Sequence, residues 1–207
     1  DVVDFVAAEP SLAHCRVLAL NPRSLGDVLA DIRRVAEAAG CPDRGAALRT
    51  MLQQRIDVVA AACAQAPRPR VVCLEWTQPL MAAGNWTPEL IALAGGDPRL
   101  AAAGRHSPYV TWEQVQAAAP EVLLLAPCGF DLARARVEAA AVRLCPGFGD
   151  LPAVRAGRTF VIDGNTYLNR SGPRLVDSLE IIAHLIQPAC VPLPADERAE
   201  GRAWVRL

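Results

Sequence analysis

Runs of consecutive apolar residues alternate with amphipathic stretches along the 207 residues of this chain. The apolar runs predict buried strands at residues 15–22, 70–76, 121–127 and 158–163. Between them, apolar residues recur at spacings of three and four, which predicts helices at residues 24–39, 43–65, 87–94, 111–119, 131–144 and 173–186. Strands that alternate with helices predict an α/β fold, in which helices cover both faces of a parallel sheet in a three-layer, Rossmann-like arrangement.

Several element ends carry their own signals. Ser24 and Thr87 are predicted to be N-caps, and Gly157 is predicted to make a tight turn before the last strand. The helix at residues 43–65 would span more than about 30 Å, so it is interpreted either as a strut between lobes or as the second arm of a helical hairpin. The tail from Pro188 is predicted to be a surface extension.

Three loops follow the predicted strands, at residues 76–86, 127–131 and 163–172. In a parallel sheet, ligands bind at the carboxyl ends of the strands, so these loops are expected to form a binding site together. The candidate ligand-binding residues in them are Trp76, Trp86, Cys128, Phe130, Asn165, Tyr167 and Arg170.

Each candidate has a binding and a structural interpretation. Trp76 and Trp86 have the wide, flat side chains that suit planar ligands, but they could instead hold the loop against the helix. Asn165 and Tyr167 can form hydrogen bonds with amide or carboxylate groups of a ligand, and Arg170 can pair with an anionic group. The alternative for these three is that they stabilise the loop itself.

Composition narrows the class of protein. Hydrophobic residues make up 52% of the chain, which excludes a disordered protein, and the net charge of -1 gives no electrostatic reason to expect nucleic acid as a partner. All 21 basic residues are Arg, which excludes lysine-based chemistry, and no glycine-rich phosphate-binding motif occurs. No apolar run reaches the roughly 18 residues of a membrane-spanning helix.

The seven cysteines are scattered, and none lies in a C-x-x-C pair. Metal ligands normally have tighter spacing, so no metal site is expected. An odd, scattered set fits a reducing compartment better than an oxidising one. No signal peptide is visible, and this leaves the compartment open.

Four segments resemble, in order and spacing, the C-terminal lobe of the periplasmic binding proteins that deliver cobalamin and iron complexes to ABC importers. They are LEWTQPLMAAGNWTPELIALAGG, VTWEQVQAAAPEVLLLAPCGFD, LPAVRAGRTFVIDGN and GPRLVDSLEIIAHL. The pieces GNW and PCGF look most similar to a branch described as cobalamin-binding proteins. The resemblance implies a non-catalytic protein that needs no cofactor, binds cobalamin or an iron or haem chelate, and passes it to an ABC transporter permease.

In that family, two α/β lobes joined by one long helix hold the ligand between them. The resemblance therefore implies a remnant of the N-terminal lobe at residues 1–42, a connecting helix at 43–67, the C-terminal lobe at 68–188 and a tail at 189–207. The rest of the N-terminal lobe is missing from this sequence, so either the chain is a fragment or the cleft is half-built and a partner must complete it. Half a cleft is expected to bind weakly.

Two features depart from the family pattern. Family members usually carry a Glu that docks on the transporter, whereas the loop TYLNRSGPR contains none. The family also implies a periplasmic location, whereas the seven cysteines and the lack of a visible signal peptide indicate a cytoplasmic one.

The residues alone leave two further functions open. One is a Rossmann-like intracellular enzyme that uses Cys128 or the loop at Asp163, which predicts a perturbed pKa and rapid alkylation of Cys128. The other is a truncated chain that acts only as an interaction partner, which predicts an exposed apolar patch around residues 1–22.

Overall fold

A computed structural model describes residues 2–12, 14–192 and 196–207. The helices are α1 (Val2–Ala8), α2 (Leu25–Ala38), α3 (Pro42–Cys63), α4 (Thr87–Leu93), α5 (Trp112–Ala118), α6 (Leu132–Arg143), α7 (Pro152–Arg155) and α8 (Leu175–Ile186). Short helical turns lie at η1 (Pro10–Leu12), η2 (Phe148–Asp150) and η3 (Gly164–Leu168). The strands are β1 (Arg70–Thr77), β2 (Leu80–Ala82), β3 (Asp97–Pro98), β4 (Val122–Leu125), β5 (Thr159–Ile162) and β6 (Trp204–Arg206). Among the described helices, none has the length and apolarity needed to cross a membrane.

The strands form one mixed sheet in the order β2-β1-β4-β5-β6, with β3 also paired to β1. β1, β4 and β5 are parallel neighbours, whereas β2 pairs with β1 and β6 pairs with β5 in the antiparallel direction. The predicted α/β fold with parallel central strands is therefore confirmed. The antiparallel edge strands were not foreseen, because a strand of three residues carries no periodic pattern.

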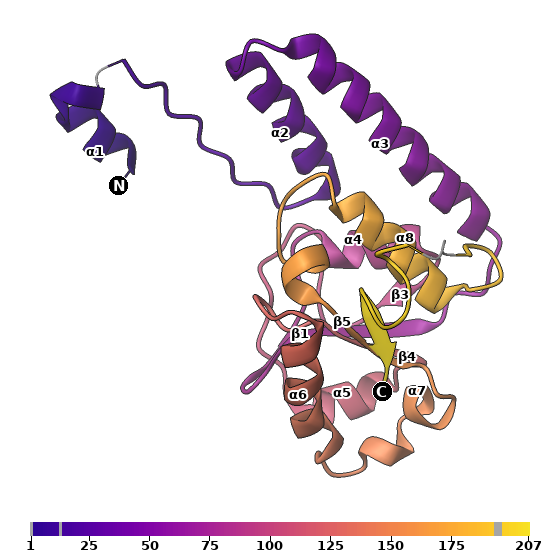
Figure 1. The fold of residues 1–207 in the computed structure, drawn as a ribbon. Helices are drawn as coiled ribbons and strands as arrows, with labels where there is room; N and C mark the ends of the chain where they lie inside the picture. The colour runs from indigo at the N-terminus through magenta and orange to yellow at the C-terminus, as the bar shows by residue number, and fades with distance from the viewer. Residues whose placement is uncertain (1, 13, 193–195) are drawn as a thin grey trace.

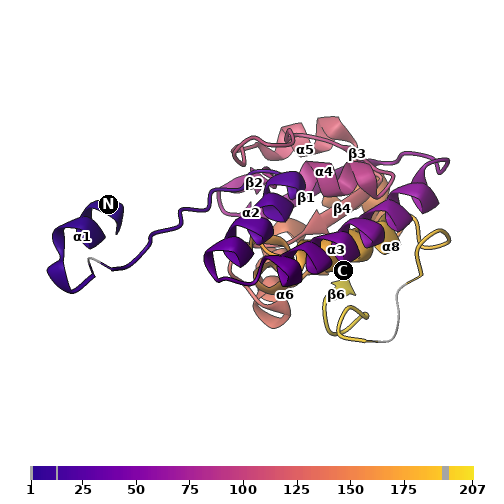
Figure 2. The same ribbon diagram turned by 90° about the horizontal axis from the view of Figure 1, so that it is seen from above.

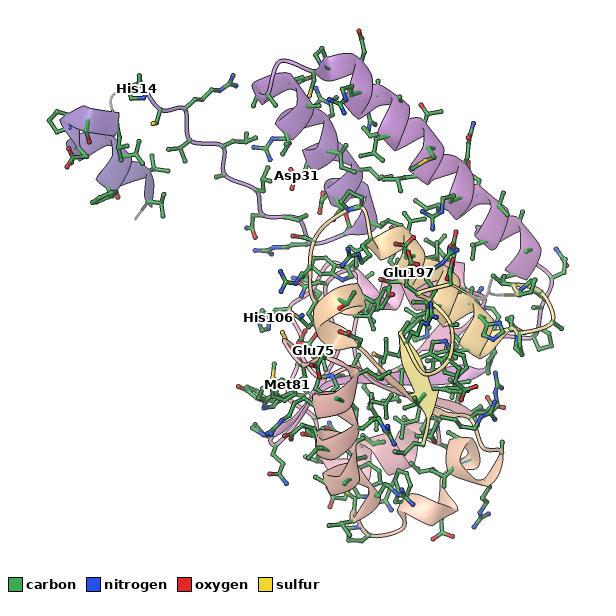
Figure 3. All side chains as sticks on the ribbon, viewed as in Figure 1. His14, Asp31, Glu75, Met81, His106 and Glu197 are labelled. Carbon is green, nitrogen blue, oxygen red and sulfur yellow. The ribbon has the colours of Figure 1, made fainter. Side chains whose placement is uncertain are left out.

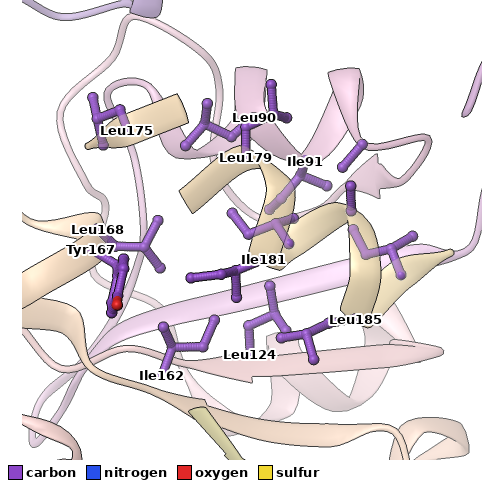
Figure 4. Packing of buried hydrophobic residues seen from close by; sticks show 14 of the residues in the cluster. Leu90, Ile91, Leu124, Ile162, Tyr167, Leu168, Leu175, Leu179, Ile181 and Leu185 are labelled. Atoms are coloured by element: carbon purple, nitrogen blue, oxygen red, sulfur yellow. The ribbon is translucent and has the colours of Figure 1, made fainter. Parts of the chain in front are cut away.

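Alternate residues of the central strands point into two cores. Val71 and Cys73 of β1 belong to the larger core, which includes residues of α2, α3, α4 and α8, whereas Val72 and Leu74 belong to the smaller core with α5, α6 and α7. Figure 1 shows these two groups of helices on opposite sides of the sheet, and Figure 4 shows α8 packed over the strands through residues such as Ile181 and Leu185. Burial on both faces explains why these strands are continuously apolar.

Helices α2 and α3 form a helical hairpin, which agrees with one of the two interpretations of the long helix, and they lie side by side in Figure 2. The predicted cap of α2 is confirmed: the Ser24 hydroxyl accepts a hydrogen bond from the Asp27 amide, and the Asp27 carboxylate accepts one from the Ser24 amide, both at 3.0 Å. Arg55 of α3 donates to Asp177 at 2.5 Å and to both carboxylate oxygens of Glu180 at 2.8 Å. The hairpin is thereby fixed to α8.

The strand predicted at residues 15–22 is wrong, because this segment has no regular structure and pairs with no described strand. A strand needs a neighbour for its backbone hydrogen bonds, and here the Ala19 carbonyl accepts one instead from the Arg34 side chain, at 2.8 Å. Figures 1 and 2 show α1 and this segment standing away from the rest of the molecule. Val2, Phe5, Val17 and Leu20 are exposed here, but they are spread over α1 and the extended segment, so the apolar patch predicted around residues 1–22 stays a prediction.

The prediction of a surface extension is wrong for the end of the chain. β6 completes one edge of the sheet, and both Ala203 and Trp204 are buried. The Trp204 ring meets the Phe160 ring edge-on with centroids 5.6 Å apart, and its Nε1 donates to the Arg198 carbonyl at 3.1 Å. The segment returns to the sheet because the large Trp204 side chain is buried there while its Nε1 keeps a hydrogen-bond partner.

Candidate functional site

The three predicted loops meet at the carboxyl edge of the sheet, where β1, β4 and β5 end. The Cys128 amide donates to the Glu75 carbonyl at 2.9 Å and joins the second loop to the end of β1. The Asn165 amide donates to the Phe130 carbonyl at 3.1 Å and joins the third loop to the second. These contacts bring five of the predicted residues to one edge of the sheet. We call them the strand-end surface: Trp76, Cys128, Phe130, Asn165 and Arg170.

An aromatic pair forms one part of the strand-end surface. The rings of Trp76 and Phe130 lie 5.4 Å apart between centroids, inclined at 37°, and both residues are half-buried. Trp76 Nε1 donates to the Gln78 carbonyl at 2.9 Å, and the Arg134 guanidinium lies 5.2 Å from the centre of the Phe130 ring. These contacts hold both rings in place, and their partly exposed faces can contact a flat apolar ligand.

A polar pair forms the other part. Arg170 donates through Nε to the Asn165 carbonyl at 3.0 Å and through its terminal nitrogen to Asn165 Oδ1 at 2.7 Å. Both oxygens of Asn165 are therefore engaged, whereas its NH2 group donates to no described residue. That NH2 group can donate to a ligand.

Trp86 and Tyr167 do not join this surface. Trp86 is the N-cap residue of α4, where Thr87 had been predicted, and its Nε1 donates to the Leu168 carbonyl at 2.8 Å. Tyr167 is only 5% exposed, and its hydroxyl donates to the Glu197 carbonyl at 2.9 Å. Buried Tyr167 therefore holds η3 in position instead of facing a ligand. Trp86 also holds η3 through its Nε1, but its ring is partly exposed, so its contact with a ligand stays a prediction.

The turn after β5 is built by Asp163 and Gly164. The Asp163 carboxylate accepts hydrogen bonds from the Thr166 amide at 2.7 Å and the Thr166 hydroxyl at 2.9 Å. At Gly164, a Cβ atom would lie closer than 3.0 Å to the Pro127 carbonyl oxygen. Only glycine therefore lets the loops after β4 and β5 approach each other, and the Asp-Gly pair in the sequence is the signal for this turn.

Sequence reasoning missed three further residues at this edge, Glu75, Met81 and His106, which Figure 3 shows on the same side of the molecule. Met81 pairs through its backbone with Tyr109, so the segment around His106 lies beside β2. The available signal was Glu75 itself, a charged residue inside the otherwise apolar run of β1.

Electrostatics oppose the enzyme interpretation of Cys128. Burial raises the pKa of the Glu75 carboxyl, and the Ser107 hydroxyl and the His106 ring offset part of this effect. Burial also raises the pKa of the Cys128 thiol, and the negative charge of Glu75 adds to the rise. A raised pKa leaves less thiolate, the opposite of what a nucleophile needs. Within the described ranges, no group of three or more His, Cys, Asp or Glu residues is placed to hold a metal ion.

Solved structures share this fold. A periplasmic heme binding protein from Pseudomonas aeruginosa is 24% identical, with a TM-score of 0.71 over 90% of this chain and 71% of that chain. The periplasmic heme-binding protein RhuT from Roseiflexus sp. RS-1 is 27% identical, with a TM-score of 0.66 over 82% and 65%. The periplasmic vitamin B12 binding protein BtuF of Vibrio cholerae is 20% identical, with a TM-score of 0.65 over 88% and 72%.

The chain thus spans 65–72% of the length of these relatives. No protein of curated function matches it. A family model described as periplasmic binding protein matches residues 9–166, which include most of the sheet, the first two loops and the start of the third. The chain therefore belongs to the periplasmic binding protein family.

Proposed function

We propose that this chain is a substrate-binding protein for a corrinoid such as cobalamin or for an iron or haem chelate, and that it works with ABC-type import. The family consists of binding proteins and not of enzymes, which agrees with the expected non-catalytic role. Relatives of the same fold are described as binding heme or vitamin B12, and both ligands are large, flat chelates.

The observation that carries the proposal is the aromatic pair at the carboxyl edge of the sheet. This edge is where open α/β sheets bind ligands, and Trp76 and Phe130 offer ring faces there with centroids 5.4 Å apart. A macrocycle laid on these rings would bury apolar area at little conformational cost, because both side chains are already held by neighbours. Asn165 and Arg170 would then contact polar groups at its rim.

The proposal includes a division of the chain. Residues 68–188 would be the C-terminal lobe, 43–67 the connecting helix and 1–42 part of an N-terminal lobe. Residues 189–207 would be a tail that completes the C-terminal lobe through β6. Delivery to a permease would use a surface other than the family's glutamate, because the loop TYLNRSGPR has none.

The test is a titration of the protein with cyanocobalamin and, separately, with haemin, followed by tryptophan fluorescence corrected for ligand absorbance. We expect saturable quenching by at least one of them. Phe130→Ala keeps every tryptophan as a reporter and should weaken binding about 5- to 150-fold, since truncating a central aromatic contact costs about 1–3 kcal/mol. Leu144→Ala is the control, because Leu144 is 86% exposed just beyond the far end of α6.

Two results would count against the proposal. One is the absence of saturable quenching by either chelate up to about 1 mM, which corresponds to roughly -4 kcal/mol. The other is quenching that Phe130→Ala leaves unchanged, because the ligand would then lie elsewhere.

A further inference from the structure

Glu75 is the least expected residue at the strand-end surface. It lies in β1 between buried Leu74 and half-buried Trp76, and it is itself only partly exposed. Among the described residues, no Arg lies within ion-pair distance of its carboxylate, although ion pairs are frequent elsewhere in the chain. The Ser107 hydroxyl and the His106 ring stabilise its charge in part, but burial outweighs both and raises the pKa of the carboxyl. A half-buried carboxylate that lacks an Arg partner costs stability, and such residues are typically kept for a function.

The neighbouring loop is fixed against Glu75 by backbone contacts. The Asn85 amide donates to the Arg105 carbonyl at 2.6 Å, and the Gly84 amide donates to the Ser107 hydroxyl at 3.0 Å. At Gly84, a Cβ atom would lie 2.5 Å from the Arg105 oxygen, so only glycine permits this approach.

The same loop fixes the hydrogen-bonding character of His106. Its Nδ1 lies 3.0 Å from the Ser107 carbonyl oxygen and must donate a hydrogen there. The Nε2 atom of the neutral ring is then an acceptor. Glu75 and His106 lie on the same side of the molecule (Figure 3), and of the two the Glu75 carboxylate is the group that can only accept when it is ionised.

Two cationic groups at the strand-end surface, Arg170 and Arg134, are already engaged. Arg170 is bound to Asn165 through two nitrogens. Arg134 donates to Glu138 at 2.5 Å and lies over the Phe130 ring. A ligand carboxylate would therefore meet acceptors and paired guanidinium groups, whereas a ligand amide could donate to Glu75 and accept from the Asn165 NH2 group.

We infer that Glu75 sets ligand specificity, so that the strand-end surface prefers chelates whose rim carries amides over chelates whose rim carries carboxylates. This inference rests on the proposed function and narrows it to the corrinoid class, since corrinoids carry amide side chains and haem carries two propionates. The attraction is a hydrogen bond from an amide N–H to the carboxylate. The discrimination is repulsion between two carboxylates across a partly dry surface.

The test compares two ligands that differ by one charge: cyanocobalamin, and its monocarboxylate made by hydrolysing one side-chain amide. Wild-type protein should bind the monocarboxylate about tenfold more weakly, since like charges roughly 6 Å apart at an effective dielectric of about 40 repel by about 1.4 kcal/mol. Glu75→Gln should bring the two affinities within about twofold of each other. Glu37→Gln, which removes an exposed carboxylate on α2 that pairs with Arg33, should keep the tenfold difference.

The outcomes separate the inference from the proposed function. If wild-type protein binds neither corrinoid nor haemin, the proposed function fails and the inference fails with it. If it binds a chelate but holds the monocarboxylate or haemin as tightly as cyanocobalamin, the inference alone is overturned. The ligand comparison on wild-type protein decides this even where Glu75→Gln does not fold, which a thermal unfolding curve reveals.

Discussion

The packing of α2 on α3 makes a sharp prediction at Gly45. A Cβ atom at this position would lie closer than 3.0 Å to the Cβ atom of Ala36, which is itself buried. Carbon atoms in contact normally lie about 3.5–4.0 Å apart, so Gly45→Ala must push the two helices apart by at least about half an ångström. Overpacking of this kind costs about 1–3 kcal/mol, offset by up to about 1 kcal/mol because alanine favours helix.

We therefore expect Gly45→Ala to lower the free energy of unfolding by about 1–2 kcal/mol, measured by urea unfolding with circular dichroism at 222 nm. For a chain of this size, this corresponds to a fall in Tm of roughly 2–8 °C. Gly26→Ala is the matched control in α2, because its Cβ would have only the Ser24 Oγ within reach, at an ordinary 3.7 Å. That variant should be as stable as the wild type or more stable by up to about 1 kcal/mol.

A double variant isolates the contact itself. Ala36→Gly alone should destabilise by about 1–2 kcal/mol, through lost helix propensity and one lost buried methyl group. Combined with Gly45→Ala, it removes the clashing atom, so the double variant should be at least 1 kcal/mol more stable than the sum of the single effects implies. Additive effects, or a Gly45→Ala variant that behaves like Gly26→Ala, would refute this packing of the hairpin.

Two other predictions concern charged and titratable groups. Arg55→Met should lower the free energy of unfolding by about 1–3 kcal/mol in urea, because it removes hydrogen bonds to the carboxylates of both Asp177 and Glu180. Glu180 keeps a second guanidinium partner, Arg198, so the cost falls mainly on Asp177. Arg33→Met should cost under about 0.5 kcal/mol, since both partners of that pair are at least half exposed, and equal effects of the two changes would contradict the argument. The raised pKa of Cys128 means that its alkylation by iodoacetamide, followed by peptide mass mapping, should keep accelerating as the pH passes 9.0 and should be faster at pH 8 in the urea-unfolded chain. Glu75→Gln should speed this reaction by lowering the Cys128 pKa, and rapid modification of folded wild-type protein at pH 7 would instead favour the enzyme interpretation.

Local signals predicted most of the fold because they act through neighbours in sequence. The N-cap of α2 at Ser24, the long α3 and the buried β4 all follow from capping residues and periodicity. The error at residues 15–22 has the same origin: an apolar run indicates a buried strand, but it does not say whether a neighbouring strand exists. β6 escaped prediction because its pairing with β5 lies more than 40 residues away in sequence.

The candidate site shows a similar limit. The rule that ligands bind at the carboxyl ends of parallel strands identified the edge of the sheet where the candidate site lies. It could not predict the direction in which each side chain points. Trp86 and Tyr167 were grouped with Trp76 on residue type alone, and only tertiary contacts show that their polar atoms bind the carbonyls of Leu168 and Glu197. The charge inside an apolar strand was the one sequence signal that could have identified Glu75.

The glycines at this edge explain how an open surface can still be specific. Gly84 and Gly164 each occupy a place where any Cβ would collide with the backbone of another loop, so the loops are held by close approach and not by long side chains. Such a surface changes little on binding, and the ordering cost that weakens flexible sites is small. The affinity is then limited by the ligand surface that stays in contact with water. A flat macrocycle that binds through one of its faces leaves about half its surface exposed. Specificity does not suffer in the same way, because one fixed carboxylate at the contacting rim discriminates between an amide and a carboxylate whether or not the opposite face is covered.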